Sequence, residues 1–450
     1  MPITRVAGAL CVCFVTASCL RAGFAVKEPT LSGPGQDIAA QIAAGDGPGA
    51  AAAFAQLDGD GAKVAADLAF VTLDRALASS SPAIRARAID IVASHEIEPL
   101  ADEVAGLLGD PDDDVAAAAS VALLRSHPAA GRVASDLLDS ASDSARAKVV
   151  AGIGRKVGAR AHAELVVALS DPAARVRRAA AMALGGLGEA GDGAALWAVA
   201  TGDPDGRVRS AALRAVARLP AADGDVRGAL AALDDPYLGA RQAAVSVLAA
   251  RKALAELSAA ARGADLHVAV AAALAVHRLG GASAAPVLSR ALHSPLWTVR
   301  AAALASVKPG AGHREALSLA ASAMVDDRVE VRLAAAKALA SLGQVDRARA
   351  EFLAILEGPG SSLTREGDPS TSPSQRSAAA ALVRLGDPHG AKFLASLAGA
   401  RDPRVRGAAI AALSAADTVP PALIAALADP TAGIRLDAAA SILTIAPLDF

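Results

Sequence analysis

The chain has 450 residues, of which 53% are hydrophobic and only 2% aromatic, so small aliphatic side chains supply most of its apolar surface. A single hydrophobic core stops growing at about 250–300 residues, so a chain of this length either divides into domains or is built from repeats. Its 44 basic and 46 acidic residues give a formal net charge of −2, which excludes the positive whole-protein field typical of nucleic-acid binding.

The first residues have the order of charge and hydrophobicity of a secretory signal. Arg5 precedes an apolar stretch at 6–17, which is too short to span a bilayer, and small residues follow. We therefore predict a signal peptide at residues 1–25. Two processing routes fit: a lipobox that ends at Cys19, with Thr in place of the usual Leu, and ordinary cleavage after the small-x-small sequence 23–25. An uncleaved segment or a misassigned start is the remaining alternative. The first route makes Cys19 the lipidation candidate and attaches the protein to a membrane.

The cysteines are confined to this segment, at Cys11, Cys13 and Cys19. The rest of the sequence has no thiol, which excludes structural disulfides and thiolate zinc sites there. Charged residues also interrupt every later apolar run well before the ~18 residues that a membrane span needs. We expect an exported protein that lies in the periplasm, is held at the outer membrane as a lipoprotein, or is secreted.

Residues 26–62 are rich in glycine and lack the repeat that follows, so we predict a linker and N-terminal cap with one helix near 50–57. The acidic sequence at 58–60 resembles the start of a calcium loop. The next expected ligand positions hold Ala62 and Ala69, however, so we interpret this sequence as an acidic turn.

From residue 63 onward one phrase recurs: a leucine, Asp-Pro or a variant of it, a short turn, Val-Arg, small residues and a leucine. Arg146, Arg177 and Arg209 show the usual spacing, 31 and then 32 residues. About twelve copies at this period predict a repeat architecture. The arginines of the phrase form a structural repeat ladder, with alanine at positions 116 and 269: Arg85, Arg146, Arg177, Arg209, Arg241, Arg300, Arg332, Arg376, Arg406 and Arg435.

Each period predicts two helices. Val176, Ala180 and Leu184 recur at the spacing of one helical stripe, and Leu165 and Leu169 supply the stripe of the preceding helix. Asp-Pro predicts the elbow between the helices, because proline has no N–H to donate and aspartate accepts hydrogen bonds at a helix start. Glycine or proline is expected to end the second helix, as at Gly185-Gly186, Pro220, Gly280-Gly281, Gly343 and Gly386.

This repeat resembles the HEAT repeat, and its short period with Asp-Pro and Val-Arg is similar to the subtype found in phycobilisome lyases and many bacterial proteins. The resemblance covers residues 63–450. It implies an all-α fold, an α-solenoid in which about twelve helix pairs form a right-handed superhelix. It also implies that the ladder arginines and the elbow aspartates tie neighbouring repeats together. Where alanine replaces the arginine, at 116 and 269, we expect weaker joints.

One interval of the ladder is longer than the others, 44 residues from Arg332 to Arg376. It contains a Gly-, Ser- and Pro-rich insertion at 358–374, which we interpret as a loop at an elbow. Insertions in solenoids project from one face, often the binding face, so Arg365 in this loop is a candidate contact. A neutral, tolerated insertion is the alternative.

Patterns that indicate catalysis are sparse. Deoxyhypusine hydroxylases resemble this architecture and bind iron through several His-Glu pairs, but this chain has one such pair, His95-Glu96, and its other histidines are scattered. The sequence has no nucleophile elbow and no phosphate-binding loop. We therefore predict no catalytic, cofactor-binding or metal-binding residue and no cofactor. A lyase-like or metal-dependent enzyme on the same scaffold is the alternative.

The second helices of the pairs are expected to line a long concave surface. The exposed candidates for partner binding there are small or singly charged: Arg178, Ser210, Arg214, Gln242, Ser246 and Lys337, to which the loop adds Arg365. Trp197, Trp297 and Tyr237 are expected in core or elbow packing. The sequence thus predicts a monomeric, non-catalytic scaffold or adaptor of the bacterial cell envelope. It would bind an extended protein partner of unknown identity on its concave face, and no nucleic acid.

Overall fold

The computed structural model describes residues 31–448, apart from 32, 58, 60, 223, 308–312 and 359–371. The predicted signal peptide with Cys19, the acidic positions 58 and 60, and most of the insertion with Arg365 lie outside the described residues. Contacts divide the chain into two compact units, one holding Leu73–Pro220 and the other holding Leu31–Thr72 together with Ala221–Leu448. Throughout the described ranges the elements are α-helices and short 3-10 turns, and no strand occurs.

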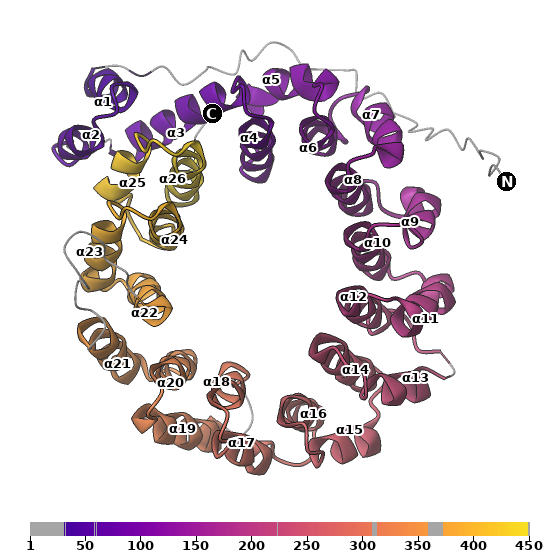
Figure 1. Ribbon diagram of the computed structural model, residues 1–450. Coiled ribbons are helices and arrows are strands. Elements are labelled where there is room, and N and C mark those ends of the chain that lie inside the picture. Colours follow the sequence, from indigo (N-terminus) through magenta and orange to yellow (C-terminus); the bar gives the residue numbers. More distant parts are fainter. Residues whose placement is uncertain are drawn as a thin grey trace. The chain divides into compact units, whose positions relative to one another are not determined.

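The first unit is a stack of helix pairs. The second helices pack on one another, α8 on α6 and α10, and α10 on α12, while α7, α9 and α11 lie on one side of them (Figure 1). This is the layering of an α-solenoid, so the predicted fold class is confirmed, while the handedness of the superhelix stays a prediction. The elements are the end of α3 (Gly61–Leu77), α4 (Pro82–Ser94), η1 (Glu98–Leu100), α5 (Ala101–Gly106), η2 (Leu107–Gly109), α6 (Asp113–Leu123), α7 (Ala130–Asp136), η3 (Leu137–Asp139), α8 (Asp143–Lys156), η4 (Gly158–Ala161), α9 (His162–Ala168), α10 (Ala174–Leu187), η5 (Ala190–Asp192), α11 (Gly193–Gly202) and α12 (Gly206–Val216).

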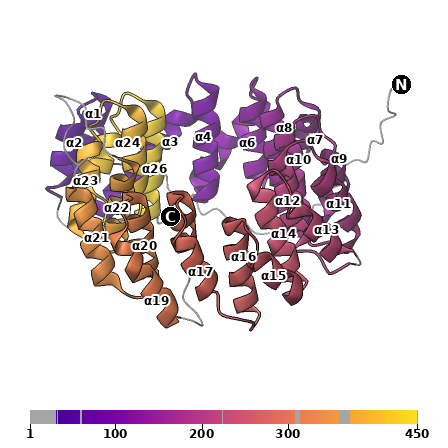
Figure 2. The same ribbon diagram turned by 60° about the horizontal axis from the view of Figure 1, so that its bottom comes forward.

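The second unit repeats this layering. Helices α18, α20, α22 and α24 follow one another on one side, and α19, α21 and α23 lie on the other (Figures 1 and 2). Among its described residues no helix combines the length and hydrophobicity of a membrane span, and the same holds for the first unit. The elements are α1 (Pro34–Ala43), α2 (Gly47–Phe54), most of α3, α13 (Asp225–Ala232), α14 (Leu238–Ala250), α15 (Leu254–Ala261), α16 (Leu266–Arg278), α17 (Ala285–Leu292), α18 (Trp297–Ala305), α19 (His313–Ser322), η6 (Ala323–Val325), α20 (Val329–Ser341), α21 (Val345–Glu357), α22 (Pro373–Arg384), α23 (Pro388–Leu397), α24 (Pro403–Leu413), α25 (Pro421–Ala426) and α26 (Ala432–Ile445).

The core of each pair follows the predicted stripes. In α10, Val176, Ala180 and Leu184 are fully buried, and Leu165 of α9 is buried opposite them. These side chains recur every three to four residues, so they share one face of the helix. Because alanine is frequent at such positions, neighbouring helices approach closely and gain dispersion contacts along their whole length.

Helix ends follow the glycine prediction in part. Gly188, Gly343 and Gly386 have φ of 75°, 85° and 68° and end α10, α20 and α22, since glycine adopts this left-handed conformation without strain. The predicted end at Gly185-Gly186 is wrong, because α10 continues through both to Leu187. A Cβ at Gly185 would lie 2.6 Å from Cα of Ala215 in α12. This glycine therefore serves close packing between repeats rather than helix termination.

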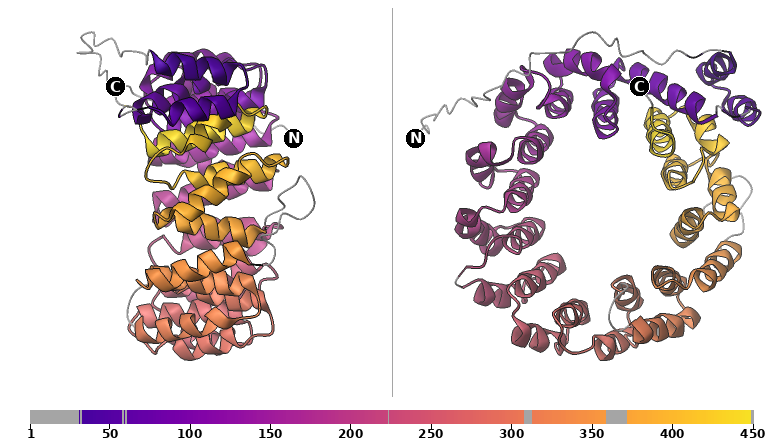
Figure 3. Two further views of the ribbon diagram at one scale, coloured as in Figure 1. Left: turned by 90° about the vertical axis from the view of Figure 1, so that its left-hand side faces the viewer. Right: turned by 180° about the vertical axis from the view of Figure 1, so that it is seen from behind.

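The segment before the repeats contains two helices, where the sequence predicts one near 50–57. Asp46 begins α2 by accepting a hydrogen bond from the backbone N–H of Gly49 (2.8 Å) at Oδ1, and α2 ends at Phe54. The glycines of this segment suggest a linker, but Gly47 instead allows close approach of another helix, because a Cβ there would lie 2.7 Å from the backbone carbonyl oxygen of Ala425. Helix α2 thus packs on α25, and the indigo and yellow helices lie side by side in Figure 3.

Candidate functional site: arginine joints and a basic groove

The ladder arginines form joints between successive repeats. Arg177 donates from Nε and Nη2 to the two carboxylate oxygens of Asp203 in the next elbow (2.7 and 2.9 Å). Its Nη1 donates to the backbone carbonyl of Asp171 in its own elbow (2.9 Å). Oδ1 of Asp203 also accepts the backbone N–H of Asp205 (2.9 Å). One guanidinium therefore ties two elbows together and holds the turn that begins α12.

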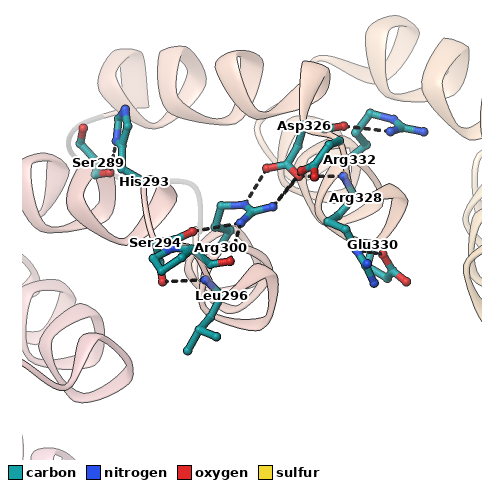
Figure 4. Close-up of polar contacts among 11 residues, drawn as sticks. Ser289, His293, Ser294, Leu296, Arg300, Asp326, Arg328, Glu330 and Arg332 are labelled. Atoms are coloured by element: carbon teal, nitrogen blue, oxygen red, sulfur yellow. Dashed lines mark hydrogen bonds and ion pairs between the residues drawn. The ribbon is translucent and has the colours of Figure 1, made fainter.

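The same geometry recurs along the chain, and Figure 4 shows it for Arg300, which points at Asp326 and at the carbonyl of Ser294. Arg332 differs, because it pairs with Glu351 (3.0 Å). Arg435 donates to the carbonyl of Asp429 in its own elbow (2.8 Å), Arg209 does the same to Asp203 (2.7 Å), and Arg376 also has a partner. The further arginine–aspartate joints are Arg85–Asp110, Arg146–Asp171, Arg241–Asp265 and Arg406–Asp429.

The two ladder positions that hold alanine have other contacts at the joint. Near Ala269, Arg290 of α17 donates from Nη2 to the backbone carbonyl of Gly263 (3.1 Å). That carbonyl stands six residues before the ladder position, where a ladder arginine would donate. Near Ala116, the Ser142 hydroxyl donates to the carboxylate of Asp114 (3.1 Å), and the Ser140 hydroxyl donates to the carboxylate of Asp113. The expected weakness of these joints stays a prediction.

The joints shift the pKa of their aspartates. Burial by itself would raise the pKa of Asp203, but the hydrogen bonds from Arg177 and from the backbone N–H of Asp205 outweigh it, so the pKa lies below its ordinary value. The pKa values of Asp110, Asp171 and Asp326 are lowered in the same way by their arginines and by backbone hydrogen bonds. These carboxylates are therefore charged in the folded protein at neutral pH.

Acid is expected to destabilise the array. An aspartate with a lowered folded-state pKa contributes stability that is complete above its unfolded pKa of about 4 and is lost as the pH falls through the folded-state value. The unfolded chain binds more protons in that window, so the free energy of unfolding should decrease from pH 5 to pH 3. Urea unfolding followed by circular dichroism at both pH values measures it. An unfolding free energy that stays level over this window would contradict the prediction.

In the described part of the chain, no group of three or more His, Cys, Asp or Glu side chains is placed so that it could hold a metal ion. His95 follows α4, and burial lowers its pKa. His162 lies 2.6 Å from Asp192, Nε2 to Oδ1, in a separate pair. Among the described side chains, the structure thus does not group histidines into a metal-binding cluster.

An open groove of about 800 Å³ lies over the second helices α8, α10 and α12 of the first unit, with α4 and α6 at one side. We call it the basic groove, because its lining includes Lys148, Arg155, Arg175, Arg178 and Arg207 but only two acidic residues, Asp90 and Asp205. The uncharged part of the lining is mostly alanine, with Val121, Ser144, Val208 and Met182, of which Met182 is exposed (59%). The groove therefore offers positive charge and apolar surface together.

Two of these cations are partnered within the protein. Lys148 pairs with Asp90 (2.8 Å) and Arg175 with Asp143 (3.3 Å). The exposed side chains of Arg155, Arg178 and Arg207 make no hydrogen bond or ion pair to any described residue. Arg207 contributes only its backbone N–H, which donates to Asp205 (2.7 Å). Three guanidinium groups are thus available to a ligand.

The residues predicted for partner binding are divided between the two units. Arg178 lies in the basic groove, and Arg214 is exposed on α12. Ser210 was expected to be exposed but is buried (3% exposed), because it faces the packed side of α12 beside Ala211. Arg155 and Arg207 were not among the residues predicted from the sequence. Arg207 could have been found, since it stands two residues before a ladder arginine, as Arg175 does in the preceding repeat.

The other candidates lie in the second unit. Gln242 lines a small cavity of about 80 Å³ between α14, α16 and α18, and Ser246 is exposed on α14. Lys337 of α20 donates to the Ser377 hydroxyl (2.6 Å), and loss of hydration, with Arg384 nearby, lowers its pKa. These three residues are not part of the basic groove.

The aromatic residues behave differently from one another. Trp297 begins α18 and stays partly exposed (37%) above an open hollow of about 520 Å³. The guanidinium carbon of Arg328 lies 5.3 Å from its ring centroid, a cation–π contact across the elbow. Trp197 of α11 is half-buried, and Tyr237 is exposed at the elbow before α14. Elbow packing therefore describes Trp297 best.

Comparison with known proteins identifies the repeat. Residues 131–217 match a family model described as HEAT repeats, which confirms the predicted resemblance over the segment that includes α8, α10 and α12. No curated protein sequence matches the chain.

Among solved structures, the chain is similar to YibA of Escherichia coli, with 16% identity, 63% of this chain and 91% of that chain covered, and a TM-score of 0.30. It is also similar to the CpcE–CpcF complex of phycocyanin lyase from Nostoc sp. PCC7120 (19% identity, 63% and 86% covered, TM-score 0.25). A third similar structure is importin beta (14% identity, 76% and 55% covered, TM-score 0.33). At these values the likenesses concern helical folds and do not extend to function.

Proposed function

We propose that this chain of HEAT repeats is a non-catalytic scaffold or adaptor that binds an extended segment of a partner protein along the face of its second helices. The observation that carries the proposal is the basic groove, where Arg155, Arg178 and Arg207 face solvent around an apolar floor without an intramolecular partner. Charged side chains around exposed apolar surface are typical of a protein-binding site.

The chemistry of the groove supports binding rather than catalysis. Its unpaired groups are guanidiniums, which stay protonated at neutral pH and cannot exchange protons with a substrate. Its carboxylates are engaged: Asp90 pairs with Lys148, and Asp205 accepts the backbone N–H of Arg207 at the start of α12. No observation favours the lyase-like or metal-dependent alternative, so the proposal is a binding function.

The proposal predicts contact at Met182. A photo-crosslinking amino acid at Met182 in cells should trap a protein partner, because this side chain is exposed in the groove. The matched control is Val167 on the first helix α9, which is more exposed (75%) but lies outside the groove. Mass spectrometry of the adducts identifies the partner. Absence of adducts at Met182, or the same adducts at both positions, would reject the groove as the binding site.

We further propose that the scaffold acts in the cell envelope, which rests on the charge and hydrophobicity of residues 1–25. Fractionation should find the protein outside the cytoplasm. If Cys19 is lipidated, cells given labelled palmitate should label the protein, and Cys19→Ala should abolish the label. Label that persists in this variant would exclude Cys19, and a cytoplasmic protein with its N-terminus intact would exclude export.

A further inference from the structure

We infer that the basic groove binds an extended acidic peptide segment, with carboxylates on Arg207, Arg178 and Arg155 and an apolar side chain over Met182. This inference rests on the proposed function and specifies the chemistry of the partner. Nothing in the sequence pattern of the repeat requires these three arginines, since the ladder arginines form the joints.

Charge complementarity indicates that the bound segment is negatively charged. Five basic and two acidic side chains line the groove, although the whole chain carries a net charge of −2. The local excess of positive charge is therefore a property of this groove. A groove with apolar walls focuses such a field and attracts an anionic segment.

Arginine geometry favours carboxylates as the bound groups. In the joints of Arg85, Arg146, Arg177, Arg300 and Arg406, one guanidinium holds one carboxylate through two hydrogen bonds, as Arg177 does with Asp203 at 2.7 and 2.9 Å. The groove arginines have the same fork of donors and no such acceptor among the described residues. A partner carboxylate on each would complete the pairing already used between repeats.

Helix geometry gives the spacing of those carboxylates. Arg207 is the second residue of α12 and Arg178 the fifth of α10, and packed helices lie about 8–10 Å apart. An extended chain advances about 3.3 Å per residue, so acids three residues apart reach both arginines. Arg155 is the thirteenth residue of α8 and lies about 12 Å further along the helix direction. A third acid about four residues beyond the second reaches it.

Met182 fixes the position of the apolar residue. It is the ninth residue of α10, between the levels of Arg178 and Arg155 along the helices. A leucine midway between the second and third acids therefore meets its exposed side chain. The groove lining has no aromatic side chain on which a base could stack, which favours a peptide over a single-stranded nucleic acid.

The test uses the mature full-length protein and a fluorescent eight-residue peptide with glutamate at positions one, four and eight, leucine at six, and serine or glycine elsewhere. Fluorescence anisotropy should show binding that weakens as salt increases. The same peptide with glutamine in place of all three glutamates should bind about tenfold more weakly or worse, since it loses the charge-assisted hydrogen bonds to the groove arginines. This comparison leaves the protein unchanged.

On the protein side, Arg178→Gln with Arg207→Gln should weaken binding by about tenfold or more. The control is Arg132→Gln with Arg160→Gln, which removes the same charge from exposed positions of the same unit outside the groove and should leave binding within about twofold. In the Arg155→Gln variant, a glutamate at position eight of the peptide should no longer increase the binding affinity over glutamine at that position. Circular dichroism checks that each variant is folded.

Equal losses in the groove and control variants would overturn the inference, and so would peptide binding that does not depend on the three glutamates. Binding of a single-stranded oligonucleotide in place of the peptide would assign the groove to phosphates and overturn it too. Failure of this inference can be told apart from failure of the proposed function. Adducts at Met182 without peptide binding would support a scaffold that binds a protein in the groove but would reject an acidic segment as its ligand.

Discussion

Replacing Val208 with aspartate is expected to lower the free energy of unfolding of the first unit by about 4 kcal/mol or more. Val208 is the third residue of α12 and is fully buried (0% exposed). Aspartate there would lose its hydration, or would force α12 away from its neighbours. Urea unfolding monitored by circular dichroism at neutral pH measures the loss.

The matched control is Met182→Asp, which places the same carboxylate on the neighbouring second helix α10 at an exposed position. We expect that substitution to change stability by about 0.5 kcal/mol or less, because the charge stays hydrated. A small effect of Val208→Asp, similar to that of the control, would mean that α12 is not packed as the structure shows.

Removal of one joint carboxylate is expected to have the next largest effect. Asp203→Ala should cost about 3–5 kcal/mol, because it leaves the largely buried guanidinium of Arg177 without its partner and removes the acceptor for the N–H of Asp205. Arg177→Ala, made alone and together with Asp203→Ala, tests whether the two substitutions remove the same stabilising interaction. If the two groups act as one pair, the double variant should lose much less than the sum of the single variants.

The exposed pair Arg175–Asp143 provides the comparison for the joint. Its side chains are about half exposed, and Asp143→Ala should cost less than about 1 kcal/mol. If Asp203→Ala and Asp143→Ala have equal effects, or if the effects of Asp203→Ala and Arg177→Ala simply add, the joint would not be a cooperative unit.

The sequence was sufficient to predict the architecture, because each repeat contains the signals for its own elbow, buried face and joint. Asp-Pro marks the elbow, the stripe around Val176 marks the buried face, and the arginine of Val-Arg marks the joint. It was insufficient where one residue type has two uses. Gly185 resembles a helix end but allows α12 to approach α10, and only the neighbouring Ala215 distinguishes these uses.

The candidate site was harder to predict than the fold. Ser210 looked exposed from its polarity, yet it lies on the packed side of α12. Arg155 and Arg178 belong to different repeats and stand at different levels of their helices, so no pattern within one repeat joins them. The basic groove exists only once α8, α10 and α12 are packed, which a single-repeat motif does not encode.

The packing of α2 on α25 has a consequence for the order in which the protein is made. Gly47 and Ala425 meet in the folded chain although 378 residues separate them in the sequence. Helix α2 is synthesised before α25 and can dock only once α25 has been made, whereas each repeat finds its neighbour about 31 residues away. Contacts that close such long intervals form late, because the chain entropy must be lost first. Docking of α2 on α25 therefore requires a chain that has been synthesised at least through Ala426.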